Sequence, residues 1–411
     1  MALPRDELLA LIERIKAQDI EVKAWRAFSD KNALNCPPNG EFQNATGPLS
    51  GLTVGVKDII DVAGIPTRHG SLIYENAPPA LADAECVTLM RAAGATIVGK
   101  TVTTELATFV PSVTRNPRNL NHTPGGSSSG SAAAVAAGHV DIAIGTQTAG
   151  SIIRPAAYCG VFGFKPSFGL VPRGGVKVQS ETLDTVGVFA RSVEHCEAWL
   201  AAMMPPPVRT ASATEPIRRP LRVAVITNLL DLASDEMRDA VRRAKSVLMG
   251  SGYDVTESTL PPALANAHEL QSIIQQYEVS RAYLPESETQ STDLTPALRD
   301  ALSAGRTISD DEYAEAVARS LQARKAAAGW FVGRDVWLMP SAPDSAPLGL
   351  LSTGDPLFNR LAAILGAPAV NVPGCRDKHG LPLGLQLLGA VREDRRLLKD
   401  AARIAPLLKF D

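Results

Sequence analysis

Small and hydroxyl-bearing residues gather in two short segments near the middle of the chain. Residues 125–131 are all Gly or Ser, and residues 146–151 read TQTAGS. Glycine lets the backbone approach a ligand closely. A serine that follows such a turn, near the start of a helix, can be surrounded by backbone N–H groups, the arrangement that stabilises an oxyanion. The two segments therefore indicate nucleophilic catalysis at a serine.

A flexible linker is the alternative interpretation, because Gly/Ser-rich runs usually connect domains. Here the two runs flank apolar sequence instead. Residues 132–138 are typical of a helix closed by glycine, and residues 141–145 of a strand. A linker would also not need hydroxyl groups spaced along the end of a strand, so we favour a catalytic site.

The two segments resemble the signature of the amidase signature family of serine hydrolases. The resemblance extends to residues 51–67 (GLTVGVKDIIDVAGIPT) and to residues 359–389, and it covers most of residues 50–190 and 335–390. Within the family, GTQTAGSIIRPAAYCG and the STGDP run at 352–356 are most similar to bacterial malonamidase-type members.

This resemblance implies a catalytic triad of Lys57, Ser127 and Ser151. Ser151 matches the nucleophile, and Ser127, after a cis peptide bond to Gly126, matches the serine that bridges it to the lysine. Lys57 lies in an apolar strand pattern, where desolvation lowers the pKa of an ammonium group and prepares it to act as a base. A solvated lysine, or one paired with Asp58, is the alternative, and the match of VGVKDIID to the family motif favours the base.

The resemblance also implies the oxyanion donors. They are the backbone N–H groups of four consecutive residues, Thr148, Ala149, Gly150 and Ser151. Gln147 stands directly before them, where many members of the family have Asp.

Three further residues are assigned to the substrate-binding part of the site. Ser129 and Thr146 match family positions that hold the triad through hydrogen bonds. Arg154, three residues after Ser151, matches an arginine that contacts a substrate carboxylate, although a structural salt bridge is the alternative. A guanidinium binds a carboxylate through two parallel hydrogen bonds, so we favour the first role.

Composition excludes several other classes of protein. The 411 residues contain 41 Lys and Arg against 43 Asp and Glu, which leaves no basic surface for nucleic acid or for a membrane. No apolar run reaches the ~18 residues that a membrane span needs. Five dispersed cysteines and six histidines show no metal-binding spacing. We expect a soluble, cytoplasmic enzyme without a metal or other cofactor.

The surrounding pattern alternates strands and helices, as in an α/β fold. Strands are predicted at 52–57, 96–99, 221–227, 253–257, 336–339 and 369–372, and helices at 5–28 (a single helix or a helix pair), 86–93 and 234–251. The family resemblance implies one amidase domain over residues 1–411, with a central mixed, mostly parallel sheet flanked by helices. Residues 205–330 are expected to form a helical lobe on this core, and the Pro-rich stretch at 203–220 a linker or surface loop.

We therefore expect an amidohydrolase that cleaves the C–N bond of a small amide through an acyl-enzyme and releases ammonia or an amine. The resemblance implies a malonamate- or malonamide-like substrate that bears a carboxylate, and a homodimer. The alternatives are a glutaminase subunit of a tRNA-dependent amidotransferase complex, or an amidase, esterase or carbamate hydrolase of broader range. A catalytically silent relative is disfavoured by the complete set of Lys57, Ser127 and Ser151.

Overall fold

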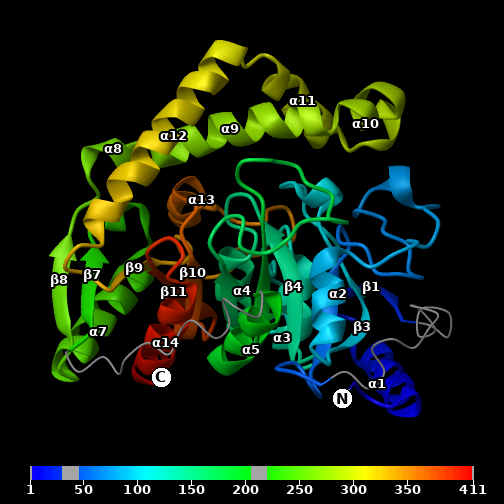
Figure 1. The fold of residues 1–411 in the computed structure, drawn as a ribbon, viewed down its shortest axis with the longest axis horizontal. Helices are drawn as coiled ribbons and strands as arrows, with labels where there is room; N and C mark the ends of the chain where they lie inside the picture. The colour runs from blue at the N-terminus through cyan, green and yellow to red at the C-terminus, as the bar shows by residue number, and fades with distance from the viewer. Residues whose placement is uncertain (1, 30–45, 205–219, 410–411) are drawn as a thin grey trace.

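A computed structural model describes residues 2–29, 46–204 and 220–409. An 11-stranded sheet runs through this part of the chain in the order β1-β3-β2-β4-β6-β5-β10-β11-β9-β7-β8 (Figure 1). Its strands are β1 (Trp25–Phe28), β2 (Thr53–Lys57), β3 (Thr96–Thr101), β4 (Ile142–Gln147), β5 (Phe162–Lys165), β6 (Thr185–Ala190), β7 (Arg222–Ile226), β8 (Asp254–Ser258), β9 (Val336–Pro340), β10 (Ala369–Arg376) and β11 (Pro382–Leu388).

The sheet is mixed. Strands β3, β2 and β4 are parallel neighbours, as are β9, β7 and β8, and the other neighbouring pairs are antiparallel. This central mixed sheet, flanked by helices, is the α/β/α architecture expected from the sequence, although antiparallel neighbours outnumber parallel ones in it, six pairs to four.

Alternation along the strands sorts apolar side chains to two faces, because successive residues of a strand point in opposite directions. In β7, Val223 and Val225 join one core cluster, and Ala224 and Ile226 join the other. Helices that cover the first face are α2 (Glu85–Ala92), α5 (Val193–Met203), α7 (Asp235–Gly250) and α14 (Asp394–Ile404). Helices that cover the second face are α1 (Arg5–Gln18), α3 (Ser129–Ala136), α4 (Ile153–Cys159) and α13 (Arg360–Leu365).

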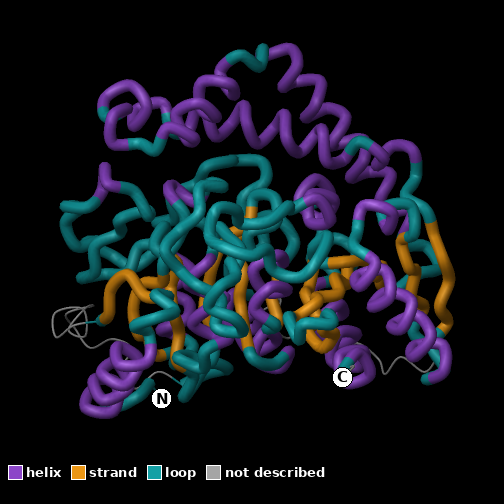
Figure 2. Tube along the Cα trace, turned by 180° about the vertical axis from the view of Figure 1, so that it is seen from behind, coloured by secondary structure: helices purple, strands orange, loops and turns teal. Residues whose placement is uncertain are grey.

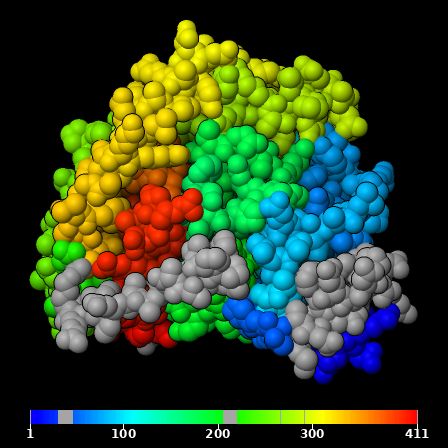
Figure 3. Space-filling view, in the orientation of Figure 1, coloured from blue at the N-terminus to red at the C-terminus, as the bar shows by residue number. Residues whose placement is uncertain are grey.

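A helical lobe lies over one end of the strands. It contains α8 (Pro262–Ala265), α9 (Ala267–Ala282), α10 (Leu284–Thr289), α11 (Pro296–Arg306) and α12 (Asp310–Trp330). Loops fill the layer between these helices and the strands (Figure 2). In the space-filling view the lobe, coloured yellow-green to yellow, lies directly against the green middle part of the chain (Figure 3).

Two segments differ from the pattern expected for them. The helical lobe expected at 205–330 begins only at Pro262. Residues 222–258 belong to the core instead, because they form strands β7 and β8 of the sheet and the helix α7 between them. The expected helix at 5–28 ends at Gln18, and Trp25–Phe28 pairs with β3 as an edge strand. Most of the predicted linker at 203–220 lies outside the described residues.

The described helices include none that combines the length and apolar character needed to cross a bilayer.

Candidate active site

The predicted site residues meet at one edge of the sheet, beneath the helical lobe. Lys57 is the last residue of β2, and Thr146 lies at the end of β4. These two strands are parallel neighbours, with Val56 opposite Ile144, so their carboxyl ends lie side by side. Ser127 lies just before the first turn of α3, and Ser151 just before the first turn of α4.

Lys57 is fully buried and contacts two of the predicted residues. Its Nζ donates hydrogen bonds to Ser127 Oγ at 2.7 Å and to Thr146 Oγ1 at 2.9 Å. Burial lowers the pKa of this ammonium group to about 7, although the negative charge of Asp184 acts in the opposite direction. The alternative pairing with Asp58 is wrong, because Asp58 forms its ion pair with Lys100 at 3.1 Å.

The loop that carries Ser127 has the backbone expected from the family resemblance. The peptide bond between Gly126 and Ser127 is cis, which confirms that expectation. Gly125 adopts a φ of +82°, a conformation that favours glycine. Ser129 Oγ donates to the carbonyl oxygen of Gly125 at 2.8 Å, so Ser129 holds this loop rather than a triad side chain.

Ser151 lies at the surface of a cavity, with its hydroxyl free. Within the described ranges it has no hydrogen bond to Ser127 or to any other residue, so the structure places these two serines on adjoining loops without joining them. The turn beyond it is held by Gln147, whose Oε1 accepts hydrogen bonds from the N–H groups of Ile152 (2.8 Å) and Ile153 (3.0 Å). Sequence reasoning noted Gln147 only as a departure from the family and missed this role.

Thr148, the first predicted oxyanion donor, is tethered through both its side chain and its carbonyl group. Its hydroxyl donates to Oδ1 of Asp184 and accepts from Gln179 Nε2 at 2.7 Å. Its carbonyl oxygen accepts from Nε2 of Gln271, a buried residue of α9 in the lobe, at 3.3 Å. Sequence reasoning missed these three tethering residues, which are distant in the sequence and carry no recognisable motif.

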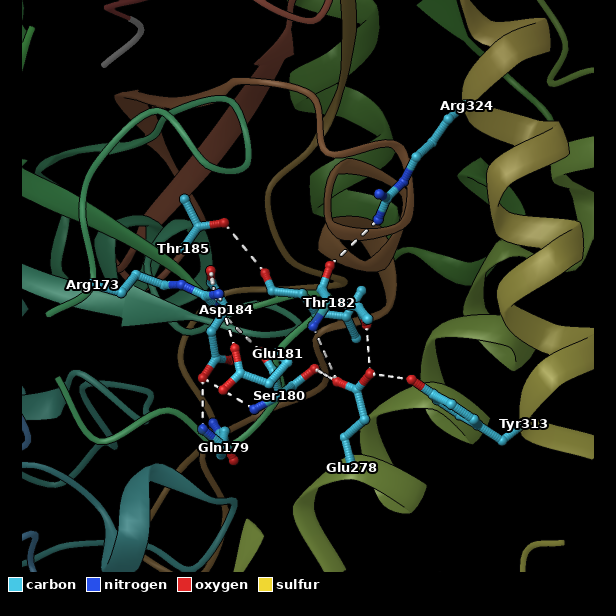
Figure 4. A network of polar contacts seen from close by, with 11 residues as sticks. Arg173, Gln179, Ser180, Glu181, Thr182, Asp184, Thr185, Glu278, Tyr313 and Arg324 are labelled. Carbon is cyan, nitrogen blue, oxygen red and sulfur yellow. Dashed lines mark hydrogen bonds and ion pairs between the residues drawn. The ribbon is translucent and has the colours of Figure 1, made fainter. Parts of the chain in front are cut away.

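The segment 179–184, which carries two of these tethering residues, is itself fixed by Asp184 and by the lobe (Figure 4). Asp184 Oδ2 accepts from the backbone N–H groups of Gln179 (2.8 Å) and Ser180 (3.2 Å). Its burial raises the pKa of the carboxyl group. From α9, Glu278 accepts hydrogen bonds from Ser180 Oγ and, at 2.8 Å, from Thr182 Oγ1. The lobe therefore fastens directly to the loops around the site.

Arg154 is buried without a carboxylate partner. Its Nη2 donates to the carbonyl oxygen of Gly126 at 2.7 Å and to Thr353 Oγ1 at 3.3 Å, while its Nε has no partner. No carboxylate of the described residues lies within ion-pair distance of it, so the salt-bridge interpretation is wrong. Burial lowers the pKa of the guanidinium to about 10, although the charges of Tyr158 and Asp355 act in the opposite direction.

The cavity next to Ser151 has a volume of about 410 Å³ and is lined by residues of both the core and the lobe. Arg154 and Arg360 are the charged residues that line it within the described chain, and no acidic residue does so. The remaining walls combine glutamine side chains with apolar ones. No group of three or more His, Cys, Asp or Glu residues in the described ranges is arranged to hold a metal ion.

Comparison with known proteins identifies the family. The sequence profile described as Amidase matches residues 6–398. The chain belongs to the amidase family. It is 34% identical to a glutamyl-tRNA(Gln) amidotransferase subunit of Thermus thermophilus, over 97% of this chain and 92% of that protein.

Solved structures give the same result for the fold. One is a chain from a vestigial protein complex related to the origins of an s-triazine catabolic enzyme, with a TM-score of 0.86, 27% identity and coverage of 98% of this chain and 94% of that one. Another is 6-aminohexanoate cyclic dimer hydrolase, with a TM-score of 0.85, 26% identity and coverage of 98% and 93%.

The protein is therefore an amidase-family hydrolase that acts on C–N bonds. The family expected from the sequence is confirmed. The more specific similarity to malonamidases is not supported, because the curated relatives carry the name of an amidotransferase subunit.

Proposed function

We propose that this amidase hydrolyses a small carboxylate-bearing amide through an acyl-enzyme on Ser151. The observation that carries the proposal is the contact of the buried Lys57 with Ser127 Oγ, 2.7 Å away. Ser127 lies on a loop whose Gly126 is hydrogen-bonded to Arg154, and Arg154 and Ser151 both line the cavity. A lysine whose pKa is lowered to about 7 is neutral in a large fraction of molecules near neutral pH, and a neutral amine can accept the proton of a serine.

The mechanism then follows from the chemistry of these three groups. Lys57 accepts a proton from Ser127 while Ser127 accepts the proton of Ser151, whose Oγ attacks the amide carbon. Because catalytic hydrogen bonds often tighten only in the substrate complex, the free hydroxyl of Ser151 turns toward Ser127 when substrate binds. The proton passes to the leaving nitrogen, which departs and leaves the acyl group on Ser151. Water then gives a proton to the same relay and attacks the acyl carbon, and Ser151 regains its proton as the acid is released.

The turn at residues 148–151 supplies the electrostatic part of catalysis. Backbone N–H groups of Thr148, Ala149, Gly150 and Ser151 donate to the oxyanion in this proposal. A turn held in place before the reaction stabilises developing charge without a cost of reorganisation. The tethers on Thr148 and the two hydrogen bonds that Gln147 accepts provide such rigidity.

The carboxylate of the substrate is assigned to Arg154. This guanidinium is only 5% exposed and lacks an acidic partner, with an unpaired Nε, so it has unused hydrogen-bonding capacity. Arg360 lines the same cavity and adds a second positive charge. Thr146, which was expected to hold the triad through hydrogen bonds, contacts Lys57, so we propose that it positions the base.

A glutaminase subunit of an amidotransferase is the second candidate. It is favoured by the curated relatives, which are named as glutamyl-tRNA(Gln) amidotransferase subunits and align with nearly the whole chain. Glutamine is also a carboxylate-bearing amide, so Arg154 suits either candidate. The substrates of the two candidates differ in the α-ammonium group, which only glutamine has. This positive charge would enter a cavity whose described lining contains two arginines and no acidic residue. On this ground we place the free-standing amidase first.

Both candidates place the protein in the cytoplasm. The free and buried thiols fit a reducing compartment, and they are those of Cys86, Cys159, Cys196 and Cys375.

Ammonia release by the purified chain tests the proposal. Malonamate, glutamine and propionamide are compared at equal concentration, with Ser151→Ala as the control for contaminating activity. Turnover of malonamate above propionamide and glutamine is expected. Turnover of glutamine alone would favour the second candidate, and undiminished activity in Ser151→Ala would refute the mechanism.

A further inference from the structure

The cavity next to Ser151 has two chemically different ends. Arg154 and Arg360 occupy one end, where Arg154 contacts Gly126 and Thr353. The other end carries the apolar side chains of Phe109 from the loop after β3, Val279 from α9, and Leu298 and Leu302 from α11, and glutamine side chains line the wall between the two ends. Val279, Leu298 and Leu302 belong to one apolar cluster, whereas Arg360 contacts the first turns of α9, at His268 O and Ser272 Oγ.

The turn that carries Ser151 lies between these ends. On the arginine side a Cβ at Gly150 would lie 2.5 Å from Oδ1 of Asn359, the residue next to Arg360. On the apolar side, Gln179 Nε2 donates both to Thr148 Oγ1 (2.7 Å) and to the carbonyl oxygen of Ala107 (3.1 Å), two residues from Phe109. An amide bound at Ser151 therefore has the guanidinium groups on one side and apolar walls on the other.

The volume of the cavity exceeds what a minimal substrate needs. Malonamate has about seven non-hydrogen atoms, and even at the ~30 Å³ that a water molecule occupies in the liquid these atoms fill only about 210 Å³. The cavity measures about 410 Å³. Phe109 lines the cavity, and this large apolar residue is 52% exposed, so part of the cavity wall is apolar surface that malonamate would leave uncovered. Covering such a surface with an apolar group is favourable.

We propose that the substrate carries an apolar or aromatic group on the opposite side of its scissile amide from its carboxylate, and that Phe109, Val279, Leu298 and Leu302 bind this group. The inference rests on the proposed function and specifies its substrate class. Hydrolysis adds one water: the acyl carbon is transferred to Ser151 Oγ and then to water, and the amine leaves with the proton relayed from Lys57.

Substrates with one or two matching ends test this inference. N-Benzylmalonamate and N-phenylacetylglycine each join a carboxylate to an aromatic group across an amide, in opposite orientations. Malonamate lacks the aromatic group, and N-benzylpropanamide lacks the carboxylate. We call an amide two-ended when it has both the carboxylate and the aromatic group, and one-ended when it has only one of them. For at least one two-ended amide we expect kcat/KM to be roughly ten- to hundredfold higher than the values for both one-ended amides, as burial of an aromatic ring or pairing of a carboxylate predicts. The preferred orientation then identifies which half of the substrate is the acyl group.

Variants of the apolar end supply the second measurement. Phe109→Ala removes exposed apolar surface, and Ala301→Trp fills the cavity from the neighbouring turn of α11. Each is expected to lower kcat/KM for the preferred two-ended amide about tenfold while changing the value for malonamate less than twofold. Val113→Ala is the matched control, because Val113 is an exposed apolar residue of the same loop that does not line this cavity.

The outcomes separate the inference from the proposed function. If malonamate is hydrolysed as well as both two-ended amides, or if Phe109→Ala and Ala301→Trp affect all substrates equally, the apolar subsite is refuted and the proposed function stands. If none of the carboxylate-bearing amides is hydrolysed, the proposed function itself fails, and the inference fails with it.

Discussion

The pH dependence of hydrolysis should report the ionisation of Lys57. Burial lowers the pKa of this ammonium group from 10.5 to about 7, a change that corresponds to about 5 kcal/mol between its charged and neutral forms. Near pH 7 about half of the enzyme then holds a neutral base, compared with about one molecule in 3,000 for an unperturbed lysine. The proposed mechanism therefore depends on this desolvation.

The direction of the pH dependence follows from the role of Lys57 as a base. The charged form predominates below the pKa and cannot accept a proton, so activity rises with pH. We expect log kcat/KM for an amide to rise with a slope of one to a midpoint near pH 7 and then to level off, with roughly hundredfold lower activity at pH 5. Initial rates of ammonia or amine release across pH 5–10 measure this curve, and circular dichroism at each pH monitors folding.

A second buried lysine provides a matched control. Lys165 is also fully buried, its pKa is also lowered to about 7 by burial, and its Nζ donates to the carbonyl oxygen of Pro166 at 2.8 Å, away from the cavity. Lys165→Met should leave the midpoint unchanged, whereas Lys57→Ala should abolish the pH-dependent limb and greatly reduce amide hydrolysis. Esters should lose less activity, because their leaving alkoxide needs less help from a general acid.

A wild-type midpoint above pH 9, or a limb near pH 7 that survives in the residual ester hydrolysis of Lys57→Ala, would refute the reasoning. If the midpoint moves in Lys165→Met, the pH-dependent limb belongs to Lys165 and not to Lys57.

Three further predictions concern residues around the cavity. Ser151→Ala should lower kcat by several orders of magnitude with an unchanged circular dichroism spectrum, and Ser127→Ala should be milder, because a water molecule can bridge the gap; equal losses would contradict the relay. Arg154→Ala should cost ~2–5 kcal/mol in kcat/KM for a carboxylate-bearing amide and much less for a neutral amide of the same size, and equal effects would make Arg154 structural. Gln271→Met should lower kcat about fivefold with little change in KM, because loss of the hydrogen bond to Thr148 costs ~1 kcal/mol and loosens Thr148; a change confined to KM would contradict a positioning role.

Local patterns in the sequence were sufficient for the parts of the fold that immediately carry the site. The alternating apolar residues predicted β2 and β4 to within one or two residues, and Gly125 had to be glycine because of its positive φ. These features depend on backbone sterics and on burial of a single strand, which short stretches of sequence specify. Lys57 was identified as a desolvated amine only through the match of VGVKDIID to the family motif, because the strand pattern alone favoured a solvated or ion-paired lysine.

Other elements required the tertiary structure. Strands β6 and β11 were not predicted, because short apolar runs such as TVGVFA and PLGLQLL are equally compatible with buried helix. Trp25–Phe28 was expected to be helical, but its pairing with β3 and the stacking of Trp25 on Phe28 override local propensity.

The sequence by itself determined the family and predicted the roles of Lys57, Ser127 and Ser151. Only the tertiary structure decided how the oxyanion turn is held and what shape of substrate the cavity accepts. Asp184, Gln271 and Glu278 are distant in the chain from the residues they bind, and the apolar end of the cavity joins a core loop to two helices of the lobe. Contacts of this kind leave no local pattern, because each side chain gains its role only when separate elements pack together.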